Sequence, residues 1–171
     1  MGVSAVNGLD VLIRQSFYGG HYAMIDHDTL DPNPDFWLSY IYKTLVGEDV
    51  LNVTVGDQSR LLRLYAHCTN TKRSNYSKGS VTLYGMNLDD SPRTMVLKQF
   101  GVNVKSHVYL LQPPDGNLKS QLIALNDRTL KLNEDYSLPN VLTPIIHSGN
   151  FTFPPQSFGF IVLPSVKLPI C

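Results

Sequence analysis

The segment from Leu9 to Gly47 constrains the fold most strongly, because its pattern indicates a strand, a glycine loop and a helix in that order. Val11-Leu12-Ile13 is a continuous apolar run of the kind found in strands that are buried on both faces. A Gly19-Gly20 pair then interrupts the chain. Asn33-Pro34 is placed to cap and begin a helix, and Gly47 is placed to end it.

The expected helix presents one apolar face, formed by Trp37, Leu38, Ile41 and Leu45. One strand and one helix cannot bury all of each other's apolar surface, so this βα unit needs further elements to pack against. In barrels and doubly wound sheets, the loop that follows a strand is where ligands bind. We therefore expect the loop after residues 11–13 to be the functional part of this segment.

From Glu48 onward the pattern changes to short strands separated by turn signals such as Lys78-Gly79 and Gly56-Asp57. Many short strands at this spacing are typical of an antiparallel β-sandwich. We therefore predict a mostly β fold with two parts, a βα unit at 1–47 and a β-sandwich domain at 48–171. The proline-punctuated segment 133–149 is expected to be an ordered surface crossing. Strands are expected at 50–55, 61–68, 80–88, 94–97, 107–111, 121–125, 129–132 and 157–163.

The composition is that of a globular protein, with 43% hydrophobic and 16% charged residues. Lys and Arg together number 14, as do Asp and Glu, so the chain as a whole does not attract nucleic acid, and any polyanion binding must be local. No apolar run is long enough to span a bilayer. Residues 1–6 lack the basic start and the apolar core of a signal peptide.

Glycosylation sequons at Asn52, Asn75 and Asn150 nevertheless favour a secreted protein. The sequons favour secretion, whereas residues 1–6 do not form a signal peptide. We expect that the chain is the carboxyl-terminal end of a longer protein, which would account for both observations. The two cysteines, Cys68 and Cys171, either form a disulfide or are two unrelated buried thiols. We favour the disulfide, because a terminal cysteine has little reason to be present for packing and the sequons indicate an oxidising compartment.

The sequence contains no complete catalytic or metal-binding pattern of its own. The histidines have no metal-ligand spacing, no cofactor motif is present, and the aspartates between residues 26 and 35 fit turns and a helix start better than a calcium loop. Glycoside hydrolysis requires two paired carboxylates, but the only glutamates, Glu48 and Glu134, are not paired at strand ends.

One ligand-binding candidate remains, the loop that contains Arg14, Gln15, Gly20, His21 and Tyr22. A tyrosine ring can stack on a sugar, and glycines let the backbone approach a ligand closely. The alternative is a strand-end turn with the tyrosine packed inward, and the spacing alone does not choose between the two.

Several blocks of the sequence resemble the carboxyl-terminal part of animal heparanases: IRQSFYGGHY, DPNPDFWLSYIYKTLVG, LRLYAHCTNT, GSVTLYGMNL and YLLQPPDGNLKSQLIALN. Heparanases are retaining endo-β-glucuronidases that cut heparan sulfate and combine a (β/α)8 TIM barrel with a β-sandwich. The resemblance implies that residues 9–47 are the last strand and helix of such a barrel. It further implies that the acid and nucleophile glutamates of the glycoside hydrolase lie upstream, so that no residue of this chain is catalytic.

The resemblance also implies binding roles. The saccharide-contacting Gly-Asn-Tyr loop of the family corresponds to Gly20-His21-Tyr22, a preceding glutamine to Gln15, and the sandwich disulfide to Cys68–Cys171. Two departures matter: His21 replaces an asparagine in a loop one residue shorter, and the stretch Lys43–Arg63 carries few of the family's basic residues. The implied partners are heparan sulfate and the upstream barrel. The implied locations are the extracellular matrix and the lysosome.

Two alternatives stay open. A non-catalytic relative like heparanase-2 would bind heparan sulfate without cutting it, and the upstream glutamates would decide between the two. A stand-alone β-sandwich carbohydrate-binding module would fold from residues 48–171 alone. The apolar helix face from Trp37 to Leu45 argues against that module, because a free module has no use for a barrel helix.

Overall fold

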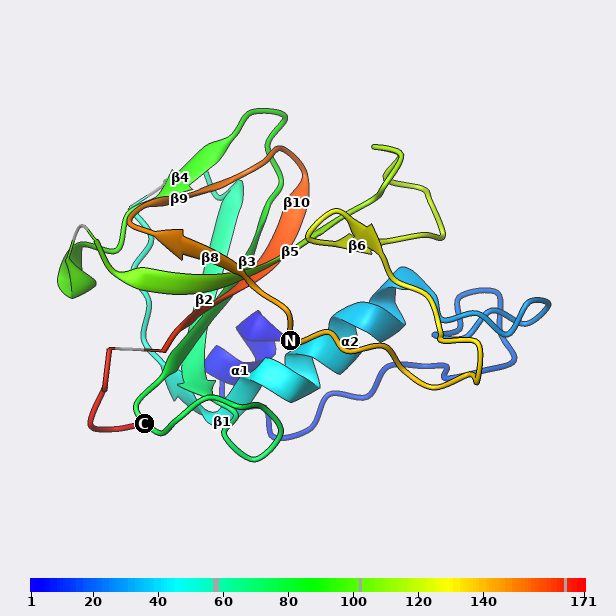
Figure 1. Ribbon diagram of the computed structural model, residues 1–171, viewed down its shortest axis with the longest axis horizontal. Helices are drawn as coiled ribbons and strands as arrows, with labels where there is room; N and C mark the ends of the chain where they lie inside the picture. The colour runs from blue at the N-terminus through cyan, green and yellow to red at the C-terminus, as the bar shows by residue number, and fades with distance from the viewer. Residues whose placement is uncertain (57–58, 102, 165) are drawn as a thin grey trace.

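In the computed structural model, an eight-stranded antiparallel sheet lies between a helix on one face and a small two-stranded sheet on the other (Figure 1). The structure describes residues 1–56, 59–101, 103–164 and 166–171. The large sheet has the order β1-β2-β3-β10-β5-β6-β7, and β8 pairs with β5. Its strands are β1 (Val46–Leu51), β2 (Leu62–Thr69), β3 (Val81–Asn87), β5 (Lys105–Gln112), β6 (Ala124–Leu125), β7 (Arg128–Thr129), β8 (Ile145–Ser148) and β10 (Ser157–Leu163).

The remaining elements are short, apart from one helix. The small sheet consists of β4 (Arg93–Met95) and β9 (Phe151–Phe153), and the helices are α1 (Gly2–Val6), α2 (Pro34–Leu45) and the 3-10 helix η1 (Lys98–Phe100). Within the described residues, no helix has the length and apolar character that crossing a membrane requires.

Helix α2 begins where the sequence predicts, at Pro34 after Asn33. The side chain of Asn33 does not cap the helix but donates a hydrogen bond of 2.9 Å to the carbonyl of Ala23, which ties the preceding loop to the helix start. The helix ends close to the predicted position, with Val46 as its C-cap and Gly47 directly after it, but Gly47 is not a left-handed cap. The helix ends at Leu45, because the next residues already pair with β2 as strand β1. Gly47 is needed there for close approach, since a Cβ atom would lie 2.5 Å from a backbone oxygen of β2.

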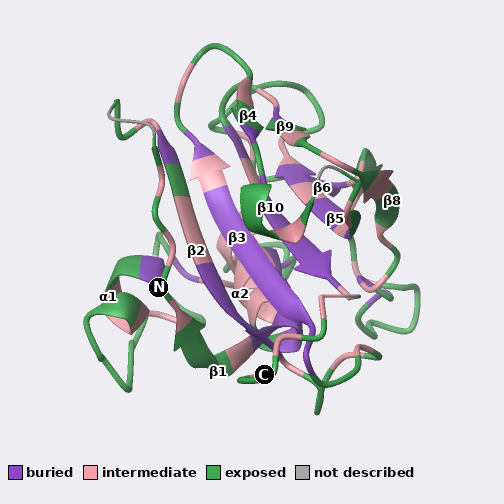
Figure 2. Cartoon of the chain, turned by 90° about the vertical axis from the view of Figure 1, so that its left-hand side faces the viewer, coloured by how far each residue is buried: buried purple, intermediate pink, exposed green. Residues whose placement is uncertain are grey.

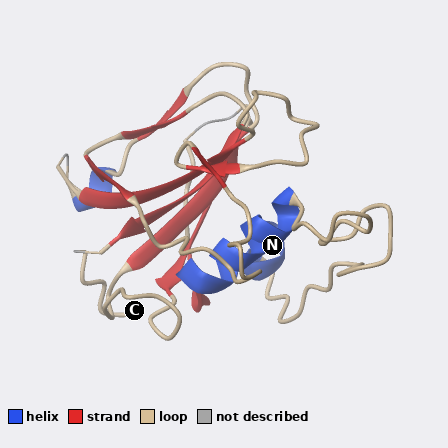
Figure 3. Ribbon diagram, turned by 45° about the vertical axis from the view of Figure 1, so that its right-hand side comes forward, coloured by secondary structure: helices blue, strands red, loops and turns tan. Residues whose placement is uncertain are grey.

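The apolar face of α2 is covered by the large sheet of the same chain. Trp37, Ile41 and Leu45 are fully buried in one cluster with aromatic residues of the sheet such as Tyr84 and Phe160. Figure 3 shows the helix lying across the sheet. The apolar face of α2 is therefore covered without a barrel, and it does not argue against a free-standing module. The domain boundary predicted near residue 47 remains a prediction, and α2 and the sheet share a core across it.

The opposite face of the large sheet packs on the small sheet. Leu83, Ile161 and Leu163 point to this side and form a second buried cluster with Met95 of β4 and Phe153 of β9. The central strands β3 and β10 are buried along their length in Figure 2 because both of their faces are covered. The predicted antiparallel sheets are confirmed, but the second sheet is only two strands wide and α2 adds a third layer.

The strand predictions are most accurate in the centre of the sheet. The expected strands at 61–68, 80–88, 107–111 and 157–163 correspond closely to β2, β3, β5 and β10. The segment 133–149 contains strand β8, which pairs with β5, and β9 was not predicted either. Both form through pairing with distant residues, which the local sequence does not show. In the turn predicted at Gly56-Asp57, Asp57 lies outside the described residues.

The predicted strand at residues 11–13 is not formed. Val11, Leu12 and Ile13 have no regular structure and are 67%, 55% and 86% exposed. A strand that is buried on both faces needs neighbouring strands to pair with and layers above and below it. The described part of the chain places none beside these residues and forms no closed barrel.

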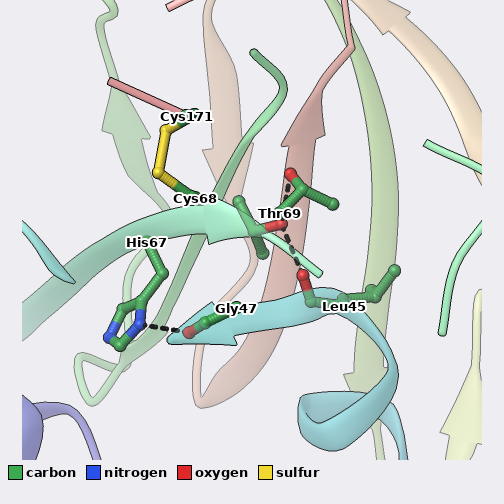
Figure 4. The surroundings of a disulfide bond; sticks show 7 residues. Leu45, Gly47, His67, Cys68, Thr69 and Cys171 are labelled. Atoms are coloured by element: carbon green, nitrogen blue, oxygen red, sulfur yellow. Dashed lines mark hydrogen bonds between the residues drawn. A yellow bond between two sulfur atoms is a disulfide. The ribbon is translucent and has the colours of Figure 1, made fainter. Parts of the chain in front are cut away.

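A disulfide joins Cys68 at the end of β2 to Cys171, with Cα atoms 5.2 Å apart (Figure 4). The favoured pairing is therefore present in the structure, and the alternative of two unrelated thiols is not. The bond attaches Cys171 to strand β2, which is the neighbour of β1 in the sheet. The two cysteines are separated by 103 residues in the sequence, so the bond closes a long loop.

We predict that replacing both cysteines, Cys68→Ser with Cys171→Ser, lowers the free energy of unfolding by roughly 4–5 kcal/mol in the chain-entropy model. The measurement is urea unfolding of wild-type and variant protein produced through a secretory pathway. A mass spectrum of the secreted wild type that shows two free thiols would contradict the bridge itself.

The side chain of His67 connects the start of β1 to the sheet interior. It is 3% exposed, its Nδ1 lies 2.8 Å from the carbonyl oxygen of Gly47, and its Nε2 lies 3.2 Å from the hydroxyl of Tyr84 (Figure 4 shows the Gly47 contact). These partners fit a neutral ring that donates from Nδ1 and accepts at Nε2. Burial lowers the pKa of His67, and the Gly47 hydrogen bond and the charge of Asp49 oppose that shift only in part.

A lowered pKa in the folded state means that the unfolded chain binds the proton more readily. The contribution of neutral His67 to the stability of the folded protein is therefore fully present above the pKa of an unfolded histidine, about 6.5, and it decreases as the pH falls below that value. We predict that His67→Gln makes the unfolding midpoint less dependent on pH between about 7 and 5. Part of the dependence remains, because burial also lowers the pKa of His107. Parallel pH profiles for wild type and variant would contradict the prediction.

Candidate functional site

The segment from residue 9 to residue 33 runs past the N-terminal end of α2 as an extended loop (Figure 1). A hollow of about 740 Å³ lies against this loop. We call it the Tyr22 hollow. Its wall is formed by the 19–23 loop, the turn at 26–28, the first residues of α2, and Ser120 with Gln121 from the loop between β5 and β6. This volume lies in the range of small-molecule sites.

Three of the four residues predicted to bind a ligand line this hollow: Gly20, His21 and Tyr22. The tyrosine side chain is 63% exposed, so the alternative of a ring packed inward is wrong. Gly19 has a φ of 85°, a backbone conformation that glycine adopts without strain, and it turns the chain toward the hollow. Gln15 is exposed and lies outside the set of described residues that line the hollow.

Arg14 holds the loop in place. Its Nε donates a hydrogen bond of 2.8 Å to Asp35 Oδ2 in the first turn of α2, and its two terminal nitrogens donate to the carbonyl oxygens of Gln15 and Tyr22. The guanidinium carbon also lies 5.9 Å from the centre of the Tyr22 ring. Because most of its donors are used inside the protein, Arg14 orients Tyr22 and offers little charge to a ligand.

The aspartates of the following loop form turns, as the sequence suggested. Asp26 Oδ1 accepts hydrogen bonds from the backbone N–H groups of Asp28 and Thr29 and from the Thr29 hydroxyl. These bonds, led by those from Thr29, lower the pKa of Asp26. In the described part of the chain, no three His, Cys, Asp or Glu side chains gather as a metal site would require.

The hollow is lined by groups that can contact a sugar and by the carboxyl groups of Asp26, Asp28 and Asp35, which bond Thr29, His27 and Arg14 in that order. Tyr22 presents a ring face, His21 a ring nitrogen, and Gly20 a backbone without a side chain. Glu48 and Glu134 are exposed and are not among the described residues that line the hollow. Sequence reasoning missed Ser120 and Gln121, which come from the loop after the Pro113–Gly116 turn. The sequence predicted a strand at 121–125, but only Ala124–Leu125 form one (β6), so the local pattern did not place Gln121 in a loop that borders the hollow.

Comparison with known proteins gives full-length matches to this chain. A protein named hyaluronoglucuronidase from Hirudo nipponia is 39% identical over 175 residues, which cover 100% of this chain and 35% of the relative. Heparanase of Bos taurus is 37% identical and inactive heparanase-2 of Mus musculus 36% identical, again over 100% of this chain and over 32% and 31% of the relatives. The chain thus spans about a third of the length of these relatives, in their carboxyl-terminal part. No family model matches the chain.

We predict that Arg14→Lys loosens the 15–22 loop, because a lysine cannot bond the Asp35 carboxylate and two carbonyls at once. Amide hydrogen exchange within residues 15–22 should become faster, while the free energy of global unfolding changes by less than about 1 kcal/mol. Arg128→Lys, at an exposed position of β7, is the matched control. Unchanged exchange in the loop would show that Arg14 does not hold it.

Proposed function

This chain is homologous over its whole length to the carboxyl-terminal part of heparanases, and we propose that it forms the saccharide-binding end of a heparanase-like endo-β-glucuronidase. The observation that carries the proposal is the gathering of Gly20, His21 and Tyr22 around one hollow at the start of α2. In this proposal the chain binds and orients the sugar and contributes no catalytic carboxylate.

The exposed apolar run at residues 11–13 supports an upstream partner within the same protein. Exposure of three consecutive large apolar side chains to water is unfavourable, and a continuous apolar run suits a strand between two others. We propose that it becomes the last strand of a (β/α)8 barrel when the upstream part is present. Two glutamates of that barrel, an acid and a nucleophile, would then cleave the glucuronide bond with retention of configuration.

The surface features support a secreted protein. Asn52, Asn75 and Asn150 are all exposed, so each sequon is open to glycosylation. The Cys68–Cys171 bond fits an oxidising compartment. We propose that the protein is a secreted glycoprotein of the extracellular matrix and the lysosome.

Heparan sulfate is the proposed substrate, and one observation favours hyaluronan as a second candidate. Among the described residues that line the Tyr22 hollow, Arg14 is the one lysine or arginine, and it is paired with Asp35. Sulfate groups are usually bound by free arginine and lysine side chains. Asp26, Asp28 and Asp35 also line the hollow, so it suits a polymer with fewer negative charges than heparan sulfate, and the relative from Hirudo nipponia is named for hyaluronan.

A binding protein without activity is the second candidate function. The chain is 36% identical to inactive heparanase-2 and 37% identical to the heparanase of Bos taurus, so its identity to the two is nearly equal. The contact between α2 and the sheet is compatible with a module that folds without a barrel, provided that the module includes α2 and is not formed by residues 48–171 alone. Both alternatives predict saccharide binding by the full-length protein without the formation of new reducing ends.

The proposal is tested by incubating the full-length protein with heparan sulfate and with hyaluronan and measuring new reducing ends. We predict that Tyr22→Ala lowers kcat/KM by about tenfold, because a stacking contact to the sugar is lost while the exposed position leaves folding intact. Tyr136→Ala is the matched control, since Tyr136 is 84% exposed and lies away from the lining of the hollow.

Three results would change the proposal. Unchanged turnover in Tyr22→Ala removes Tyr22 from the site. Binding without cleavage by the wild-type protein replaces the enzyme with the non-catalytic binder. Cleavage of hyaluronan alone reassigns the substrate and leaves the reaction class unchanged.

A further inference from the structure

Ser120 and Gln121 lie in the β5–β6 loop, about a hundred residues after Tyr22 in the sequence, yet they border the same hollow. The family resemblance assigned no role to this loop. In the structure it forms the side of the Tyr22 hollow that the 14–35 segment does not provide.

Hydrogen bonds within the loop hold it in one conformation. Asp115 Oδ1 accepts a bond of 3.0 Å from the backbone N–H of Asn117, and Asn117 Oδ1 accepts one of 3.0 Å from Lys119. The hydroxyl of Ser120 accepts a bond of 3.1 Å from Leu122 N–H. The loop is anchored where Ile123 packs against the α2 side of the core. Ser120 and Gln121 are therefore presented from a loop that is ordered before a ligand binds.

The same two residues also border two further hollows. Ser120 borders an apolar hollow of about 460 Å³ that contains Phe158, here called the Phe158 hollow. Gln121 borders a hollow of about 400 Å³ that contains Lys131, here called the Lys131 hollow. The Lys131 hollow shares Asp26, Asn33 and Gln121 with the Tyr22 hollow, so the two hollows adjoin at these residues. Gln121 therefore lies on the border between the hollow that holds Tyr22 and the hollow that holds Lys131.

Gln121 is suited to contact a polysaccharide. Its side chain is exposed, and none of the described residues forms a hydrogen bond with its amide. A neutral amide both donates and accepts, so it can bond a sugar hydroxyl and also a carboxylate without requiring a sulfate group. Lys131 supplies one positive charge in a lining that also holds Asp26 and Asp31, so every sulfate group that a ligand adds beyond its uronic acid carboxylates would face like charge there.

We propose that Gln121 is a specificity-determining contact to the polysaccharide, and that the chain extends from the Tyr22 hollow over Gln121 into the Lys131 hollow. The favoured ligand is a uronic acid polymer with few sulfate groups. The inference rests on the proposed function, because it requires that the Tyr22 hollow binds a saccharide.

The test is calorimetric binding of hyaluronan and heparan sulfate octasaccharides to the full-length protein. Gln121→Ala should weaken hyaluronan octasaccharide binding about fivefold, the loss expected for one neutral hydrogen bond. Gln121→Arg should shift the preference toward the heparan sulfate octasaccharide by about fivefold, since a charge-assisted bond to sulfate replaces the neutral one. Both variants should keep a melting temperature within about 2 °C of wild type, because the position is exposed.

Gln99→Ala and Gln99→Arg are the matched controls, since Gln99 is exposed in η1, an element that packs on the opposite face of the large sheet. If the Gln121 variants behave like the Gln99 variants while Tyr22→Ala still weakens binding, the inference is overturned and the proposed function stands. If wild-type protein binds neither octasaccharide, the proposed function fails. If Gln121→Arg and Gln99→Arg gain the same affinity for the heparan sulfate octasaccharide, the added positive charge acts without regard to its position, and the inference is overturned.

Discussion

The contact between helix α2 and the large sheet is the interaction on which the rest of the structure depends. Trp37, Ile41 and Leu45 are fully buried against the sheet, where each large side chain contributes roughly 1.5–3 kcal/mol of transfer free energy. This contact fixes the helix position. It therefore also fixes the helix start, where Asp35 receives Arg14 and where the 9–33 segment is attached.

The candidate site is built on that fixed helix start from two directions. From the amino-terminal side, Arg14 bonds Asp35 and the carbonyl of Tyr22, so the aromatic ring is positioned relative to α2. From the sandwich side, the β5–β6 loop brings Ser120 and Gln121 to the same hollow. The sheet therefore supports the helix and also supplies a wall of the site.

Among the described residues, the candidate site lacks the free basic side chains of a surface that binds a highly sulfated polymer. Arg14 is neutralised by Asp35, and Asp26 is occupied with the turn at Thr29. The exposed carboxylate of Asp28 also lines the hollow, beside a tyrosine ring, an amide and backbone groups that can recognise sugars through shape and hydrogen bonds.

The sequence by itself determined the elements whose signals are local. These are the start of α2 at Asn33–Pro34, the central strands β2, β3, β5 and β10, the disulfide partners, and the Gly20–Tyr22 loop as a ligand candidate. Only the tertiary structure decided what covers the helix face, that residues 11–13 form no strand here, and that Gln121 faces Tyr22's hollow. The physical reason is that local sequence patterns encode hydrophobic periodicity and turn chemistry, whereas these outcomes depend on which distant segments are available for pairing and packing.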